Sequence, residues 1–150
     1  IFNINNYLLS ANPNLLSTNK TCEYFCWRFL EHPKISYGLN VIEKNNKKLF
    51  YIFEINQNNY GKELIVLDYI GDFELLGKFI NEISKISKKY DVTYTLILKK
   101  NNVKTSEFIR KLYIPQKRKN FVVLPIKDVY KDLALTYKNW DLCLGMHDSV

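Results

Sequence analysis

The clearest pattern in the chain is the helical spacing of apolar residues from Leu76 to Tyr90. Apolar side chains recur there every three or four residues, and the lysines and glutamate between them would face water. The apolar positions are Leu76, Phe79, Ile80, Ile83, Ile86 and Tyr90. Asp72 shortly before them is a natural N-cap. The pattern predicts an amphipathic helix that packs one face on a sheet.

Strand-like runs flank this helix. Three runs precede it, rich in β-branched and aromatic residues: Tyr37–Glu43, Leu49–Ile55 and Leu64–Ile70. The short turns KNNKK and NQNNYG between them predict antiparallel hairpins. Val92–Leu98 follows the helix, so a right-handed crossover should make the third and fourth strands parallel.

Further elements are expected at both ends. A helix capped by Ser17, Thr18 or Thr21 should end at His32-Pro33, because the residue before proline is pushed out of the helical region. Its apolar stripe is Cys22, Phe25, Cys26, Phe29 and Leu30. Thr105–Tyr113 predicts a second helix, Asn120–Ile126 a fifth strand, and WDLCLGM (140–146) a sixth. The fold class is therefore α+β, with a mixed sheet and helices on both faces.

Length and composition indicate one packed domain over residues 1–150. Hydrophobic residues make up 47% of the chain and aromatic residues 15%, which excludes a disordered chain. Because the chain starts at Ile1, we expect a piece of a longer protein, with residues 1–17 a loop or the remnant of an upstream element. No apolar run approaches the roughly 20 residues that span a bilayer. The three cysteines read as free thiols without a metal, which fits the cytoplasm.

The positive charge is concentrated in one segment. Residues 99–119 carry eight basic side chains against Glu107 alone, which equals the net charge of +7 for the whole chain. A solvated helix face and an anionic partner both explain this segment. Nucleic acid is not the expected partner, since only Phe108 and Tyr113 could stack on bases.

The order of these elements is similar to that of the GNAT acetyltransferase superfamily. The stretch YFCWRFLEHPKISY, residues 24–37, resembles the Trp-Arg, His-Pro and Tyr pattern of GNAT-like proteins linked to surface-polysaccharide and capsule genes. The ending NWDLCLGMHDSV resembles their closing strand, where a tryptophan precedes a glycine and acidic residues. The resemblance covers about residues 18–150.

The resemblance implies a three-stranded antiparallel meander, a βαβ crossover and closing strands. Acetyl-CoA, or another acyl-CoA, would lie where the third and fourth strands diverge. Main-chain N–H groups there would hold the pyrophosphate, as N–H groups at a helix start do. The implied cofactor-binding residues are Leu67, Tyr69, Ile70, Gly71, Asp72, Phe73 and Lys104. Asp68 would be the base for an amine acceptor, and Tyr113 the acid for the leaving thiolate.

Two departures from the superfamily pattern leave the activity open. Its phosphate loop has Arg or Gln, two residues, Gly, one residue, then Gly or Ala, whereas LDYIGDFELLGKF (67–79) spaces its glycines widely. The tyrosine usual in the second helix is also missing, since Phe108-Ile109 stands in its place. The first hypothesis is an acyl-CoA-dependent N-acyltransferase acting on an amino sugar of a surface glycan. The alternative is a catalytically inactive lobe that binds a second GNAT-like lobe or forms a homodimer.

Other residues with reactive side chains are weighed against structural roles. Glu54 is a second candidate base. We expect His32 to pair as a cation with the carbonyls at a helix end, and Trp27 to pack against the sheet. Cys143, His147 and Asp148 have the residue types of a nucleophile, a base and an orienter, but chain order alone does not give them that geometry.

Overall fold

The computed structural model describes residues 20–100, 103–111 and 113–115, together with residues 132, 136, 140, 142 and 143. Its centre is a four-stranded sheet in the order β1-β2-β3-β4. The strands are β1 (Gly38–Lys44), β2 (Lys47–Asn58), β3 (Gly61–Gly71) and β4 (Tyr94–Ile97). The first three are antiparallel neighbours and β4 is parallel to β3, which confirms the meander and the crossover.

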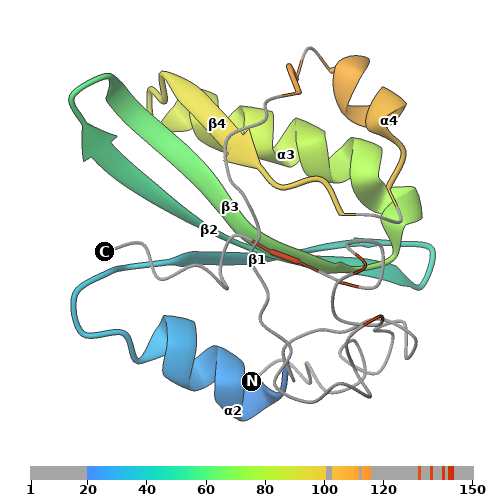
Figure 1. The fold of residues 1–150 in the computed structure, drawn as a ribbon, viewed down its shortest axis with the longest axis horizontal. Coiled ribbons are helices and arrows are strands. Elements are labelled where there is room, and N and C mark those ends of the chain that lie inside the picture. Colours follow the sequence, from blue (N-terminus) through green and yellow to red (C-terminus); the bar gives the residue numbers. More distant parts are fainter. Residues whose placement is uncertain are drawn as a thin grey trace.

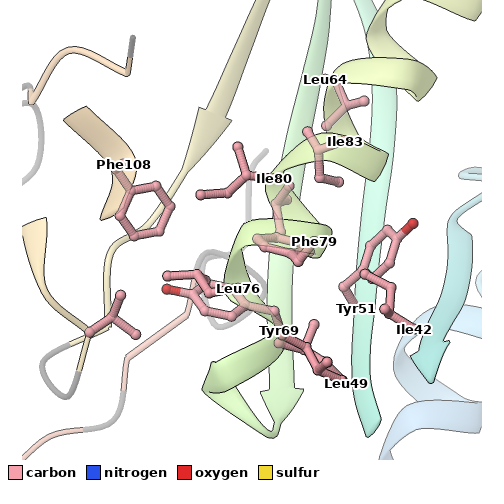
Figure 2. Close-up of a cluster of buried hydrophobic side chains, with 13 residues drawn as sticks. Ile42, Leu49, Tyr51, Leu64, Tyr69, Leu76, Phe79, Ile80, Ile83 and Phe108 are labelled. Carbon is pink, nitrogen blue, oxygen red and sulfur yellow. The ribbon is translucent and has the colours of Figure 1, made fainter. Parts of the chain in front are cut away.

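One face of the sheet is covered by α3 (Leu76–Lys89), with α4 (Thr105–Ile109) beside it, and the opposite face by α2 (Cys22–Phe25) (Figure 1). The prediction of a mixed α+β fold with helices on both faces is confirmed. Between α3 and the sheet lies the larger core, where Phe79 of α3 meets Tyr51 of β2 with ring centroids 5.2 Å apart, and Ile80 lies on the side of Phe108 (Figure 2). The buried face of α3 is the one that the apolar spacing predicts. The predicted strands 120–126 and 140–146 lie outside the described residues, except for positions 140, 142 and 143.

The helix on the opposite face changes its hydrogen-bonding pattern half-way. Thr21 caps α2, since its Oγ1 accepts from the amide of Tyr24 at 3.1 Å, as one of the three predicted caps. From Cys26 to Leu30 the chain continues as a π-helix, η1. The i→i+5 bonds alter the angular step between side chains. Phe25 and Phe29 are buried as predicted, but Leu30 is 59% exposed, so its place on the buried stripe was wrong.

A β-bulge changes which residues of β3 face α3, from the even-numbered ones before it to the odd-numbered ones after it. Phe53 pairs with Val66 and Ile52 with Asp68, so Leu67 is the extra residue on β3. Before the bulge Val66 belongs to the core under α3, and after it the odd-numbered Tyr69 does. Leu67 packs with the second core, under α2. A bulge that re-aims side chains in this way is often found next to functional sites.

Three predicted boundaries need correction. A 3₁₀ helix, η2 (Phe73–Leu75), precedes α3, and Asp72 makes no side-chain capping hydrogen bond within residues 20–100. The helix expected over Thr105–Tyr113 ends at Ile109, and the fourth strand is only Tyr94–Ile97. The chain after Ile97 leaves the sheet where the bulge bends β3.

Candidate functional site

The site follows from where β3 and β4 part. Their parallel pairing runs from Glu63↔Tyr94 to Val66↔Ile97. The bulge at Leu67 comes directly after the last of these pairs. β3 then continues to Gly71 along β2, whereas β4 has ended. The two strands therefore diverge at their carboxyl ends.

A buried ion cluster lies on the α2 side of this divergence. Asp68 Oδ2 is 2.8 Å from Lys20 Nζ, and Asp68 Oδ1 is 3.0 Å from Lys100 Nζ. The amide of Tyr69 also donates to Asp68 Oδ1, at 2.8 Å. Burial raises the pKa of Asp68, but Lys100 and Lys20 more than offset this and leave the pKa below its usual value. Asp68 is thus an ionised structural carboxylate at neutral pH, and such a carboxylate is a weak proton acceptor.

Tyr69 fills the other side of the divergence. Its ring stacks on Phe79 under α3, with centroids 5.1 Å apart. Its hydroxyl donates to the carbonyl of Leu98 at 3.2 Å and accepts from the amide of Lys100 at 3.1 Å. The phenol therefore makes the hydrogen bonds that the backbone of Leu98 and Lys100 no longer makes within the sheet, since β4 ends at Ile97. This link holds the segment after β4 at a fixed distance from β3.

The remaining predicted cofactor residues lie along the end of β3 and the start of α3. Leu67 and Ile70 are buried in the core under α2. Gly71 has a φ of +122°, and an added Cβ would lie 2.3 Å from the carbonyl oxygen of Lys48. The amide of Asp72 donates to that same oxygen. Phe73 meets the Tyr69 ring edge-on, at 5.8 Å.

The first turn of α3 is open to a ligand among the described residues. Its N-cap Leu75 provides no capping side chain. A Cβ added at Gly77 would meet no described atom within 4 Å. The amides of Leu75 and Leu76 already donate to the carbonyls of Asp72 and Phe73 in η2, so the attraction for an anion here comes from the positive end of the 14-residue helix. Phosphate groups therefore fit here, although Asp72 and Glu74 nearby carry opposing charge.

Tyr113 and Lys104 lie in the segment that follows β4. Tyr113 packs edge-on against Phe108 at 6.1 Å, and burial raises the pKa of its phenol. It would therefore stay protonated near neutral pH, as an acid for a thiolate must. Lys104 is exposed immediately before α4. The basic segment is partly structural, because Lys99 Nζ donates to the carbonyls of Lys100 and Val103.

Glu54 is a second buried carboxylate, and its pKa is shifted in the opposite direction from that of Asp68. It is only 3% exposed, and Oε1 accepts from Asn56 Nδ2 at 3.0 Å. Burial raises the pKa of Glu54 above its usual value. It projects from the same face as Ile52, the partner of Asp68, and lies two residues, or about 7 Å, further along β2. A buried carboxylate with a raised pKa is a typical proton acceptor near neutral pH.

The loop after η1 forms a pocket near Glu54. Its volume is about 350 Å³, and its lining residues are Phe29, Leu30, His32, Pro33, Lys34, Ile35, Ser36 and Tyr37. His32 does not bind carbonyls as expected: its Nδ1 accepts from the amides of Lys34 and Ile35, at 3.3 and 3.1 Å. The neutral ring must therefore carry its proton on Nε2. Trp27 is 66% exposed and does not pack against the sheet.

The other expectations fall partly on undescribed residues. Cys143 is buried, while His147 and Asp148 lie outside the described residues.

The part of the chain that the structure describes has no helix long and apolar enough to cross a bilayer. Comparison of the chain with family models, curated proteins and solved structures gave no match in any of them.

Proposed function

We propose that the protein is an acyl-CoA-dependent N-acyltransferase with a GNAT-like fold, acting on an amine such as an amino sugar. The observation that carries the proposal is the coincidence of two features on β3. The bulge at Leu67 begins where the pairing of Val66 with Ile97 ends. A bulge bends the strand that carries it and leaves its extra residue unpaired, which would favour an opening between β3 and the chain after β4. The helix that follows β3 starts at the same end of the sheet.

The open first turn of α3 supports the placement of the cofactor phosphates. N–H groups near Gly77 would bind the pyrophosphate, and Lys104 in the basic segment would be a further cation for the phosphates. When bound, the cofactor supplies an acyl group activated as a thioester. The protein must then orient an amine, accept its proton and return a proton to the leaving thiol.

Glu54 replaces Asp68 as the base in this proposal. Asp68 is held ionised by two lysines, whereas Glu54 lies on the same face with a raised pKa. Glu54 would accept the proton that the amine loses as its nitrogen bonds to the acyl carbon. Tyr113 packs with the core under α3, on the other face of the sheet from Glu54, so it would protonate the leaving thiolate through the opening between β3 and β4.

Calorimetry with acetyl-CoA, followed by a thiol-release assay with D-glucosamine, tests the proposal. We expect saturable binding, thiol release that depends on glucosamine, and a loss of roughly 10²–10⁴-fold in rate for Glu54→Gln. Lys88→Gln, at the exposed far end of α3, is the control and should retain the rate. Absence of heat at millimolar acetyl-CoA with folded protein would contradict the proposal.

A second candidate, a non-catalytic GNAT-like lobe, is favoured by the ion cluster. Asp68 places its own carboxylate on the amide of Tyr69, and Lys20 and Lys100 hold it there. An anionic ligand would have to compete with that carboxylate for the amide. A folded chain that binds neither acetyl-CoA nor CoA would favour this lobe, whose role would then be to bind a second lobe or another copy of the chain.

A further inference from the structure

The pocket formed by the loop after η1 is lined by side chains that carry hydrogen-bond donors. These are the ring of His32, the ammonium group of Lys34 and the hydroxyls of Ser36 and Tyr37. None of the described residues that line the pocket is a carboxylate. Its volume of about 350 Å³ lies within the roughly 300–1,000 Å³ usual for small-molecule sites. Such a lining favours a ligand that brings acceptors and a negative charge.

His32 offers its donor from a fixed tautomer. The amides of Lys34 and Ile35 donate to its Nδ1 at 3.3 and 3.1 Å, so the neutral ring carries its proton on Nε2. The ring also meets that of Tyr37 edge-on, with centroids 5.7 Å apart, which holds its orientation. Among the described residues, no group accepts a hydrogen bond from Nε2. This N–H group is therefore available to a ligand in the pocket.

Lys34 supplies the positive charge of the lining. Its side chain is exposed and forms no ion pair with a carboxylate in the described part of the chain. Because the His32 ring is neutral, the lining carries about one positive charge. Glu54 near the pocket is 3% exposed, and burial raises its pKa, which weakens its repulsion of an anion. One positive charge matches a carboxylate better than a phosphate group, which carries nearly two negative charges at neutral pH.

Two aromatic rings form the apolar part of the lining. Phe29 and Tyr37 meet edge-on with centroids 5.2 Å apart. Phe29 is buried in the core under α2, and Tyr37 packs against that core, so the sheet holds both rings in place. Rings fixed in this way offer apolar surface to a ligand that has a ring of its own.

We propose that this pocket binds a small monocarboxylate whose body is a single apolar or aromatic ring. The carboxylate would accept hydrogen bonds from Nε2 of His32 and from the Ser36 hydroxyl, and would pair with the Lys34 ammonium group. The ring of the ligand would lie against Phe29 and Tyr37. The inference does not rest on the proposed acyltransferase activity, because the lining alone selects the ligand.

Amide spectra of the ¹⁵N-labelled chain, titrated with benzoate and with its neutral isostere benzamide, test the site. We expect saturable shifts in the amides of residues 29–37 with benzoate. Benzamide should bind about tenfold more weakly, because it cannot make charge-assisted hydrogen bonds. Inorganic phosphate at the same ionic strength should also bind more weakly than benzoate. Equal binding of benzoate and benzamide, tighter binding of phosphate, or no shift in residues 29–37 would overturn the proposal.

Two lysine variants separate the pocket from the general positive charge of the chain. Lys34→Gln should weaken benzoate binding about threefold, as expected for an exposed ion pair. Lys44→Gln removes the same charge at the exposed opposite end of β1 and should leave benzoate binding unchanged. Both variants should keep the dispersed amide spectrum of the parent chain. Equal weakening by the two variants would show that benzoate responds to net charge alone, and would contradict the site.

Discussion

Lys100 Nζ lies 3.0 Å from Oδ1 of Asp68, and both side chains are almost completely buried. Lys100 follows β4 and Asp68 follows the bulge in β3, so the ion pair joins the two strands beyond the point where their pairing ends. The Tyr69 hydroxyl makes a second link there, to the amide of the same Lys100. The divergence is therefore fixed by side chains and does not depend on a ligand.

Replacement of Asp68 should destabilise the fold strongly. Asp68→Asn leaves Lys20 and Lys100 in the interior without their carboxylate, which costs about 3–5 kcal/mol in comparable cases. The control Glu82→Gln removes the exposed partner of Lys85 and should cost less than 1 kcal/mol. Urea unfolding at pH 7 measures both. A loss below 1 kcal/mol for Asp68→Asn would show that the buried cluster does not stabilise the sheet.

The difference in stability between the parent chain and Asp68→Asn should depend on pH in a defined way. The folded pKa of Asp68 is lowered, so its contribution is fully present above the unfolded value of about 3.9 and is lost as pH falls through the lower folded value. The stability difference between the parent and Asp68→Asn should therefore be constant from pH 5 to 7 and shrink in more acidic solution. A difference that shrinks already between pH 7 and 5 would contradict the lowered pKa.

Glu54 should show the opposite pH dependence. Its folded pKa is raised, so the folded state binds more protons than the unfolded state as pH rises above about 4.3, and stability falls over that interval. Glu54→Gln removes this dependence and should gain stability relative to the parent between pH 4 and pH 7. Urea unfolding at both pH values measures the change. An unchanged or smaller relative stability at pH 7 would contradict the raised pKa.

Tyr69→Phe should cost about 1–3 kcal/mol, because it leaves the buried amide of Lys100 and the carbonyl of Leu98 without the hydroxyl. Tyr51→Phe is the matched control, since the Tyr51 hydroxyl is bonded only to the side chain of the exposed Asn40 among the described residues. Thermal or urea unfolding of the two variants compares them directly. Equal losses would show that the Tyr69 hydroxyl is not a link between the strands.

Much of the fold could be predicted from the sequence because its elements are long and regular. The three-and-four spacing of α3 and the short turns of the meander specify helix, hairpins and crossover before any packing is considered. The bulge was not predicted, because the run LIVLDYI (64–70) is apolar on both faces. Polar and apolar residues do not alternate along it, so a one-residue change of register leaves no trace in the pattern. Asp72 was wrongly chosen as the cap, since η2 replaces the first turn expected there.

The candidate site was harder to predict because its chemistry depends on distant residues. Asp68 at a strand end has the position expected of a base, and only the fold brings Lys20 and Lys100 to it. Glu54 gains its raised pKa from burial in the middle of the sheet. The pocket depends on the loop that His32 fixes through two backbone amides, a contact that its place before Pro33 does not reveal.

The two glycines at the end of β3 and the start of α3 test the central claim, that acyl-CoA binds at the divergence of β3 and β4. Gly77→Ala should stabilise the fold by about 0.5–1 kcal/mol, because an added methyl group meets no described atom. Gly71→Ala should destabilise it, since φ is +122° and the methyl group would strike the Lys48 carbonyl. If acetyl-CoA binds on the first turn of α3, Gly77→Ala should be more stable than the parent chain and should bind acetyl-CoA more weakly.

The most direct measurement of that claim is an amide-resolved titration of the parent chain and Gly77→Ala with acetyl-CoA. The account predicts saturable shifts in the amides of Leu67–Phe73 and of the first turn of α3, none in the β1–β2 turn at Asn45 and Asn46, and weaker binding by Gly77→Ala. Shifts confined to other parts of the chain, or none at millimolar acetyl-CoA, would contradict it.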